Sequence, residues 1–196
     1  MNESSLKPII DPSGLAVADD SLLCREILAG NERAFAELAG RYRKRLFGLG
    51  YSFFKNADDS EDFIQDVLVK VYLSLAQFRG ESRFSTWLMR IAYNTGINSI
   101  RRTKEYTSLA EDFDIADPGE SPEQEHLRSC AASAVREAVS ELPERYRICV
   151  DMYFFYDMPY ADIGEVTGLP VNTIKSHVFR AKKILRERLD EEGVAE

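Results

Sequence analysis

Hydrophobic residues recur at helical spacing in two long blocks of the chain, and neither block alternates as a β-strand would. Within residues 31–54 an apolar stripe repeats at steps of three and four, formed by Phe35, Leu38, Tyr42, Leu46 and Leu49. Residues 59–75 follow the same period, with Asp59 and Ser60 as candidate N-caps. Helical patterns cover about 21–104 and resume over about 122–190. The pattern predicts an all-α protein.

Polar residues form a stripe of their own on the helix predicted after Phe84. Arg90, Asn94, Asn98 and Arg101 follow one another at steps of four, four and three, so they share one face. Arginine holds phosphates, and asparagine offers a paired donor and acceptor that can read a base edge. The apolar residues of the same helix point another way. The stripe is therefore suited to contact with nucleic acid.

Aromatic residues flank the start of this helix. The stretch 78–83 combines Phe78 with Arg79 and Arg83, and aromatic groups beside positive charge suit stacking on unpaired bases. The alternative places Phe78, Phe84 and Trp87 in the core. It is strongest for Phe84, even for Trp87 and weakest for Phe78.

A helix-turn-helix is predicted near the C-terminus. Pro159 opens a short helix that runs through Val166, Gly168 ends it, and Asn172 is expected to cap a longer basic helix. Phe179 lies opposite the apolar stripe of that second helix, among lysines. An aromatic residue there can meet a thymine methyl group in the major groove.

Charge is distributed unevenly over the 196 residues, whose net charge is −8. Residues 79–104 and 174–188 each carry six basic residues against one acidic, whereas residues 105–125 carry eight acidic residues and no Lys or Arg. The acidic segment contains Pro118, Gly119 and Pro122 and lacks helical periodicity, so it is expected to be a flexible linker. We predict two small helical domains, a loose arm over 1–20 and a tail over 192–196.

Several classes of protein find no support in the sequence. Three dispersed cysteines and two histidines form no cluster that suits zinc or a disulfide framework, so no metal or cofactor is expected. No apolar run approaches the roughly 18 residues of a membrane span, and the N-terminus does not read as a secretory signal. No nucleophile, base and orienting group come together. A non-enzymatic cytoplasmic protein without membrane insertion is expected.

Two long motifs resemble a known family. "DDSEDFIQDVLVKVYLSLAQFRGESRFSTWLMRIAYNTGINSIRR" resembles region two of bacterial sigma factors, and "LPERYRICVDMYFFYDMPYADIGEVTGLPVNTIKSHVFRAKKIL" resembles region four. A short linker between them is typical of the extracytoplasmic-function (ECF) type. The resemblance implies region two over 21–104, an acidic linker over 105–121 and region four over 122–191.

The resemblance implies binding sites residue by residue. Contacts to the minus-ten element are expected from Phe78, Arg79, Arg83, Trp87, Arg90, Asn94, Asn98, Arg101 and Arg102. Contacts to the minus-thirty-five element are expected from Asn172, Thr173, Lys175, Ser176, Phe179, Arg180 and Lys183. Contacts to core RNA polymerase are expected from Asp62, Gln65, Asp66 and Lys70.

The implied partners are the clamp and flap regions of the large polymerase subunits, promoter DNA and an anti-sigma factor. Two other functions compete with promoter recognition: a sigma mimic that sequesters an anti-sigma factor, and a helix-turn-helix regulator that uses its C-terminal block alone. One position departs from the family, since Gly164 stands where alanine is usual. This glycine either permits closer packing against the recognition helix or loosens the domain.

Overall fold

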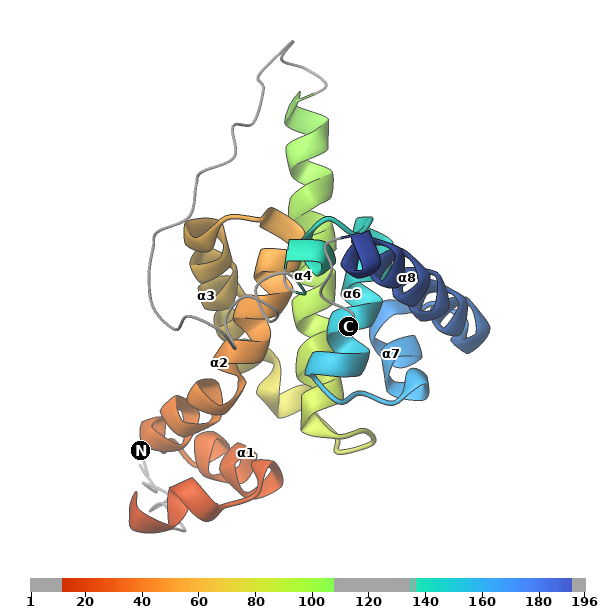
Figure 1. Ribbon diagram of the computed structural model, residues 1–196. Coiled ribbons are helices and arrows are strands. Elements are labelled where there is room, and N and C mark those ends of the chain that lie inside the picture. Colours follow the sequence, from red (N-terminus) through yellow and green to blue (C-terminus); the bar gives the residue numbers. More distant parts are fainter. Residues whose placement is uncertain (1–11, 108–134, 136, 192–196) are drawn as a thin grey trace, which may run out of the picture.

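The computed structural model describes residues 12–107, 135 and 137–191 of the chain. Every regular element in these residues is helical, as predicted (Figure 1). The first block contains η1 (Pro12–Val17), α1 (Asp20–Leu28), α2 (Glu32–Phe54), α3 (Ala57–Ser74), η2 (Leu75–Gln77) and α4 (Phe84–Thr107). The second contains α6 (Glu144–Val150), the π-helical turn η3 (Asp151–Phe155), α7 (Tyr160–Thr167) and α8 (Val171–Glu191).

Side-chain caps start the helices of the first block. Asp19 accepts a hydrogen bond from the Leu22 backbone N–H at the start of α1, and Asn31 accepts one from Ala34 at the start of α2. The prediction for α3 is wrong by three residues, because Asn56 is its cap and accepts from the N–H groups of Asp58 and Asp59. Asp59 lies in the first turn, where its negative charge interacts favourably with the positive end of the helix dipole.

The N-terminal arm is a second point of difference. Residues 1–11 lie outside the described part of the chain, but the prediction of a loose arm is wrong from Pro12 onward. Leu15 and Ala18 are buried in the core. The Arg41 guanidinium donates to the carbonyls of Leu15, Ala16 and Ala18 at 2.9, 2.9 and 2.7 Å. These bonds hold the end of the short η1 helix against α2, and the Leu15 carbonyl also accepts from the Ala18 N–H at 3.2 Å.

The larger of two hydrophobic core clusters in the described residues extends across both blocks. Residues of α1–α4 pack in one cluster with the second-block residues Ile148, Cys149, Met152, Tyr156, Met158, Ile163, Val166, Ile174 and Val178. A smaller cluster of Val139, Leu142, Tyr146, Val150 and Ala181 joins α6 to α8. Figure 1 shows α7 beside α4, while α6 packs against α2 and α8 packs against α6 and α7. The predicted linker over 105–121 begins too early, because α4 continues to Thr107; its residues 108–121 lie outside the described part of the chain.

Candidate nucleic-acid interface

The predicted helix-turn-helix is present near the C-terminus. Pro159 immediately precedes α7, and Gly168 ends it in the left-handed conformation with φ +73°. The Gly168 N–H closes the last turn on the carbonyl of Gly164 at 2.9 Å. Because glycine adopts this conformation without steric cost, the chain can turn directly into α8.

Asn172 is not the cap of α8, which corrects the expected boundary. The helix begins at Val171, and the carbonyl of Pro170 accepts from the N–H groups of Thr173 and Ile174 at 2.9 and 3.1 Å. The first turn therefore starts at Pro170, earlier than predicted. Asn172 is exposed within that turn, where its carbonyl accepts the hydroxyl hydrogen of Ser176 at 2.9 Å.

Gly164 allows the two helices to pack closely. A Cβ atom at this position would lie 3.3 Å from the Leu169 carbonyl oxygen and 3.7 Å from side-chain carbons of Ile174 and Val171. These contacts lie on the side of α7 that faces the turn and α8. The geometry favours the first of the two interpretations, close packing against the recognition helix.

The outer face of α8 is polar with an aromatic centre. Ile174, Val178 and Ala181 are buried on the inner face, whereas 69% of Phe179 is exposed. Thr173 is half-buried, and the other predicted contacts on this helix are exposed: Asn172, Lys175, Ser176, Arg180 and Lys183. The described structure thus presents Phe179 to the solvent within a positive surface, as the sequence predicted.

Two of these basic side chains also bind neighbours within the domain. Arg180 hydrogen-bonds the Tyr146 hydroxyl, which lowers the pKa of that hydroxyl. Lys183 lies 3.7 Å from the Glu187 carboxylate, one turn along α8. The Lys183–Glu187 pair is exposed, so it contributes little to stability.

The predicted stripe on α4 is exposed along its length. Arg90, Asn94, Asn98, Arg101 and Arg102 all face solvent, while Phe84, Leu88 and Thr95 are buried. Helical spacing places the stripe on one side of α4, because residues four apart lie one above another. The surface offers charge for phosphates and amides for base edges.

Phe78, Phe84 and Trp87 form one aromatic cluster. Their ring centroids are 5.2 Å apart for Phe78 and Trp87, 5.6 Å for Phe78 and Phe84, and 5.7 Å for Phe84 and Trp87. Phe84 is buried, and the other two are half-buried against the core. Phe78 is therefore less free than the sequence suggested. The exposed Arg79 and Arg83 flank this cluster across the turn at Gly80.

The predicted polymerase-binding residues divide into two groups. Asp62, Gln65 and Asp66 are exposed on the outer face of α3. Lys70 is directed toward α4, where its ammonium donates to the Thr95 hydroxyl at 3.1 Å. Asp62, Gln65 and Asp66 are thus free to contact a partner, whereas Lys70 is hydrogen-bonded within the protein.

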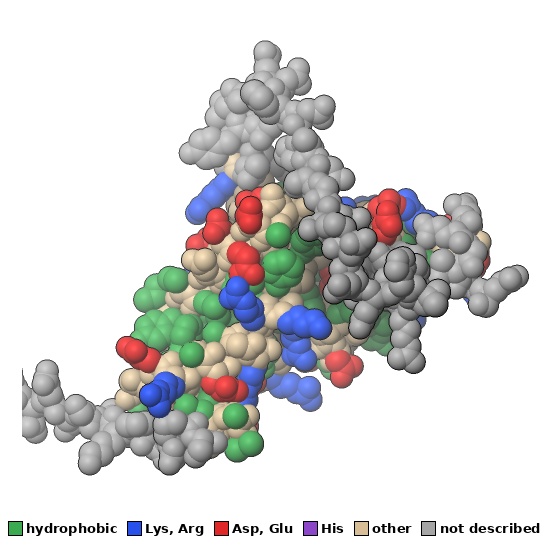
Figure 2. All heavy atoms as spheres, turned by 60° about the vertical axis from the view of Figure 1, so that its left-hand side comes forward, with side chains coloured by type: hydrophobic (Ala, Val, Ile, Leu, Met, Phe, Trp, Pro, Cys, Tyr) green, Lys and Arg blue, Asp and Glu red, His purple; other side chains and the backbone are tan. Residues whose placement is uncertain are grey.

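Exposed apolar residues on α3 were missed by the sequence analysis. Val69 is 58% exposed and Leu73 is 74% exposed. Both follow Asp62 and Asp66 at helical spacing, so they continue the same face. Figure 2, which turns the α3 side of Figure 1 forward, shows hydrophobic side chains on that face beside acidic and basic ones.

The described residues provide no metal-binding cluster and no thiol suited to catalysis. They contain no group of three His, Cys, Asp or Glu side chains able to hold a metal. Burial raises the pKa of the Cys24 and Cys149 thiols to about 11, which keeps them protonated. Across the described chain, no helix has both the length and the apolar character that a membrane span requires.

Comparisons with known proteins identify the family. Sigma-70 region 2 matches residues 38–106, and Sigma-70 region 4 matches residues 132–185. The RNA polymerase sigma-H factor of Pseudomonas aeruginosa is 33% identical over 185 residues, which cover 89% of this chain and 96% of that protein. The chain belongs to the sigma-70 family. The ECF RNA polymerase sigma-E factor of Haemophilus influenzae is also 33% identical, over 87% of this chain and 95% of that protein.

Solved sigma-factor structures share the fold. CnrH, in complex with the cytosolic domain of CnrY, superposes with a TM-score of 0.63 at 23% identity, over 88% of this chain and 97% of CnrH. RpoE of Bartonella quintana, in complex with the anti-sigma factor NepR, gives a TM-score of 0.62 at 23% identity, over 80% and 96%.

Family membership assigns the overall role. The protein is an ECF-type sigma factor that directs RNA polymerase to promoters. Sigma factors are not enzymes, so the polymerase performs the chemistry of RNA synthesis. Region 2 contains α3 and α4 with the polar stripe, and region 4 contains α6, α7 and α8 with Phe179.

Proposed function

We propose that this sigma factor reads a promoter at two places and in two different states of the DNA. Region 4 binds duplex DNA at the minus-thirty-five element through α8. Region 2 captures unpaired bases of the minus-ten element through α4 and the loop before it. One observation carries the proposal: both faces are polar, basic and exposed, while the opposite faces of the same helices are buried.

Phe179 is the central residue in the proposed recognition of duplex DNA by α8. A ring that is 69% exposed on a soluble helix gains free energy when an apolar partner covers it. In the major groove the thymine methyl group is such a partner. Lys175, Arg180 and Lys183 surround the ring with charge for phosphates, and Ser176 and Asn172 offer hydrogen bonds.

Capture of unpaired bases belongs to region 2. The half-buried rings of Phe78 and Trp87 form a rigid platform on which an unstacked base can lie, with Arg79 and Arg83 beside it. Asn94 and Asn98 can pair with base edges, while Arg90, Arg101 and Arg102 hold the backbone. Unstacking costs a few kcal/mol per base step, and this capture offsets part of that cost.

Core polymerase is the proposed protein partner of α3. Asp62, Gln65 and Asp66 suit a basic helix of the polymerase clamp, and Val69 with Leu73 adds apolar contact to the same surface. In region 4, Phe154 and Phe155 are about half exposed and are candidates for the contact with the flap. With the polymerase and the chromosome as its partners, the proposed site of action is the cytoplasm.

An anti-sigma factor is a further proposed partner. The structure of RpoE of Bartonella quintana contains the anti-sigma factor NepR, and this chain shares the fold of that RpoE. The alternative function, a sigma mimic that only sequesters such an antagonist, requires no DNA-reading surface. The exposed stripe on α4 and the exposed face of α8 favour promoter recognition instead.

Transcription from duplex and pre-opened templates tests the proposed division of roles. Asn94→Ala should lower transcription from a duplex promoter and have a much smaller effect on a template whose minus-ten region is mismatched and already open. Arg33→Ala, at an exposed position on α2, serves as the control. An equal loss on both templates would contradict a role of Asn94 in base capture.

A further inference from the structure

We propose that aromatic rings from η3 and α7 hold two lysines of α8 in position for the phosphates of the minus-thirty-five duplex. Three rings form what we call the aromatic ladder: Phe154 and Tyr153 of η3 and Tyr160 of α7. Lys182 lies over one end of the aromatic ladder and Lys175 over the other. Phe154 and Tyr160 are therefore positioning residues, which act on DNA through the lysines. The inference rests on the proposed function, because it concerns the DNA contact of α8.

The three rings of the aromatic ladder contact one another in a row. Tyr153 and Tyr160 stack with their centroids 4.5 Å apart and their planes only 3° from parallel. Phe154 packs edge to face with Tyr153 at 4.9 Å, with an interplanar angle of 87°. Both arrangements are favourable for aromatic rings. Burial, and then the hydrogen bond with the Tyr153 hydroxyl, raises the pKa of Tyr160. The rings therefore fix one another in orientation.

Each end of the aromatic ladder carries a lysine of α8. The Lys182 ammonium is 5.0 Å from the centroid of the Phe154 ring, and the Lys175 ammonium is 6.0 Å from the centroid of the Tyr160 ring. An ammonium within roughly 6 Å of a ring centroid is attracted to the face of the ring. Both lysines are exposed, so an anion can still approach their charges.

The two lysines flank Phe179. Lys175, Phe179 and Lys182 follow one another at steps of four and three, so they share one face of α8. A separation of seven residues corresponds to about 10 Å along the helix. The aromatic ladder thus fixes a positive charge on each side of the ring that is proposed to read the minus-thirty-five element. The proposal adds Lys182 to the DNA-contacting residues of α8.

Holding the lysines in advance should strengthen the DNA contact. A flexible lysine loses rotamer freedom when it binds a phosphate, and a lysine already held over a ring loses less. The cation keeps its charge, so its attraction to the phosphate backbone is retained. Because phosphate contacts fix the position of a protein on the duplex, the two lysines should also fix how Phe179 meets the bases.

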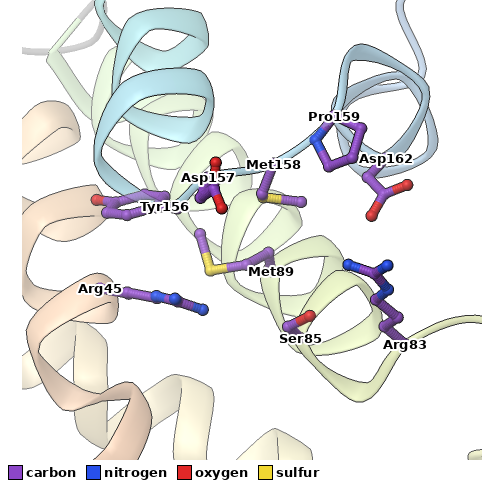
Figure 3. A pocket seen from close by; sticks show the side chains of 9 residues that line it. All are labelled: Arg45, Arg83, Ser85, Met89, Tyr156, Asp157, Met158, Pro159 and Asp162. Atoms are coloured by element: carbon purple, nitrogen blue, oxygen red, sulfur yellow. The ribbon is translucent and has the colours of Figure 1, made fainter.

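The aromatic ladder and its lysines all belong to region 4. Tyr160 and Asp162 are two residues apart on α7, so their side chains point in roughly opposite directions. Figure 3 shows Pro159 and Asp162 at the start of α7, with Asp162 directed toward Arg83 of region 2 beside a cavity of about 160 Å³. Tyr160 lies instead beside η3 and α8. A substitution at Tyr160 therefore leaves the side of α7 that faces region 2 unchanged.

A first experiment tests the positions of the lysines in the free protein by NMR. Ring currents shield protons that lie over the face of an aromatic ring, so the Cε protons of Lys175 and Lys182 should resonate upfield of those of other lysines. Lys175→Gln and Lys182→Gln identify the two signals. Tyr160→Leu should abolish the upfield shift of Lys175, whereas Tyr160→Phe should retain it. Unshifted signals from both lysines in the parent protein would overturn the proposal.

A second experiment measures transcription by core polymerase reconstituted with the full chain at limiting concentration. One template is a promoter found by mapping transcript starts. The other is the same promoter truncated between its two elements, with the minus-ten region already open. Tyr160→Leu should lower transcription from the complete promoter by roughly two- to fivefold, the value of an exposed cation–π contact. Tyr160→Phe should restore it. On the truncated template both variants should equal the parent, because region 4 has no duplex to bind.

A matched control and a double-mutant cycle isolate the role of the ring. Tyr51 of α2 is 44% exposed and stacks on Phe47 at 6.3 Å, and Tyr51→Leu should leave transcription from both templates unchanged. In a Lys175→Gln background, Tyr160→Leu should have no further effect, because the lysine through which the ring acts is already absent. Phe154 is less suited to this test, since it is also a candidate for the flap contact.

The outcomes separate the positioning role from the proposed function. A loss that persists in the Lys175→Gln background, or that is equal on the truncated template, would overturn the positioning role, because Tyr160 would then act through another contact. Parental transcription by Tyr160→Leu on the complete promoter would overturn it as well. If the parent itself gains nothing from the upstream duplex, the proposed role of region 4 in reading the minus-thirty-five element fails instead.

Discussion

Phe179 shows how one residue can distinguish a DNA-reading helix from a surface helix. Helical periodicity alone placed it opposite the core, and the structure exposes 69% of it among basic residues. Exposed aromatic rings are common on proteins, so the exposure gains meaning from its setting on the second helix of a helix-turn-helix. The sequence was sufficient to predict the exposure and the setting of Phe179, because both the apolar stripe of α8 and the glycine turn before it are local patterns.

Phe179→Ala should reduce discrimination between matched and mismatched minus-thirty-five elements. Loss of a half-covered aromatic contact is worth about 1.5 kcal/mol, or roughly tenfold in preference. Stability should change by less than about 0.5 kcal/mol, because the ring is exposed. Competitive transcription from paired templates and urea unfolding measure the two effects. An unchanged preference for the matched element in the variant would show that Phe179 does not take part in recognising the minus-thirty-five sequence.

Asp151 makes the stability of the protein depend on pH. Burial, the largest influence, raises the pKa of its carboxyl from 3.8 to about 6, so the folded chain holds the proton more tightly than the unfolded chain. The contribution of this group to stability is therefore complete below about pH 4 and is lost as the pH rises through about 6. Each pKa unit corresponds to about 1.4 kcal/mol.

Asp151→Asn should stabilise the protein at pH 7.5 by roughly 1 to 2 kcal/mol. This figure includes the cost of burying the two N–H donors of the new amide group. An asparagine oxygen can still accept from Ser52. The gain should shrink toward zero near pH 4, where the native carboxyl is already protonated. Urea unfolding at both pH values measures it, with the exposed Asp157→Asn as the control. The same gain at pH 4 and pH 7.5 would contradict the assigned cause.

At the scale of elements, periodicity predicted the helices better than their ends. Asp59 and Ser60 were the predicted caps of α3, and Asn56, which also belongs to a residue type that caps helices, was missed. The structure selects Asn56. The start of α8 was missed for a related reason, since Asn172 has a strong capping preference but Pro170 begins the turn. When several neighbouring residues could each start a helix, the way the helix packs against the rest of the protein decides which of them does.

The α3 face was only partly predictable. Its acidic residues were recognised, whereas Val69 and Leu73 read as ordinary helix positions until the structure exposed them. Lys70 was grouped with the acidic residues because its spacing fits, yet it bonds Thr95 on α4. That contact joins residues 25 positions apart in sequence. Helical spacing along one segment cannot reveal it.

Leu73→Ser should weaken binding to core polymerase by about tenfold or more, the value of burying most of a leucine side chain. Leu28→Ser replaces another exposed leucine, on α1, and should leave the affinity unchanged. Fluorescence anisotropy with labelled protein and purified core measures both. Equal affinities would exclude Leu73 from the docking surface, although Asp62 and Asp66 could still belong to it.

The whole molecule differs from its sequence-based description in one respect. Two helical domains were expected and are found, but one core extends across both. Arg147 and Asp151 gave no signal in the sequence because their partner, Ser52, lies about 95 residues earlier and is brought near by tertiary packing. Contacts between regions depend on which faces meet, and periodicity within a region does not contain that information.

Net charge should keep the isolated protein from binding duplex promoter DNA tightly. A net charge of −8 opposes the phosphate backbone. A gel shift at about 0.15 M salt should show no specific complex in the nanomolar range. Tight specific binding by the free protein would contradict this expectation.

Mapping of transcript starts tests the central claim most directly. The protein would be mixed with purified core RNA polymerase and a fragmented genomic library of its source, and the starts would be compared with those of core alone. We predict a set of defined starts that share two upstream elements and disappear without the protein. Core binding without such starts, or starts no more defined than those of core alone, would contradict a role in promoter selection.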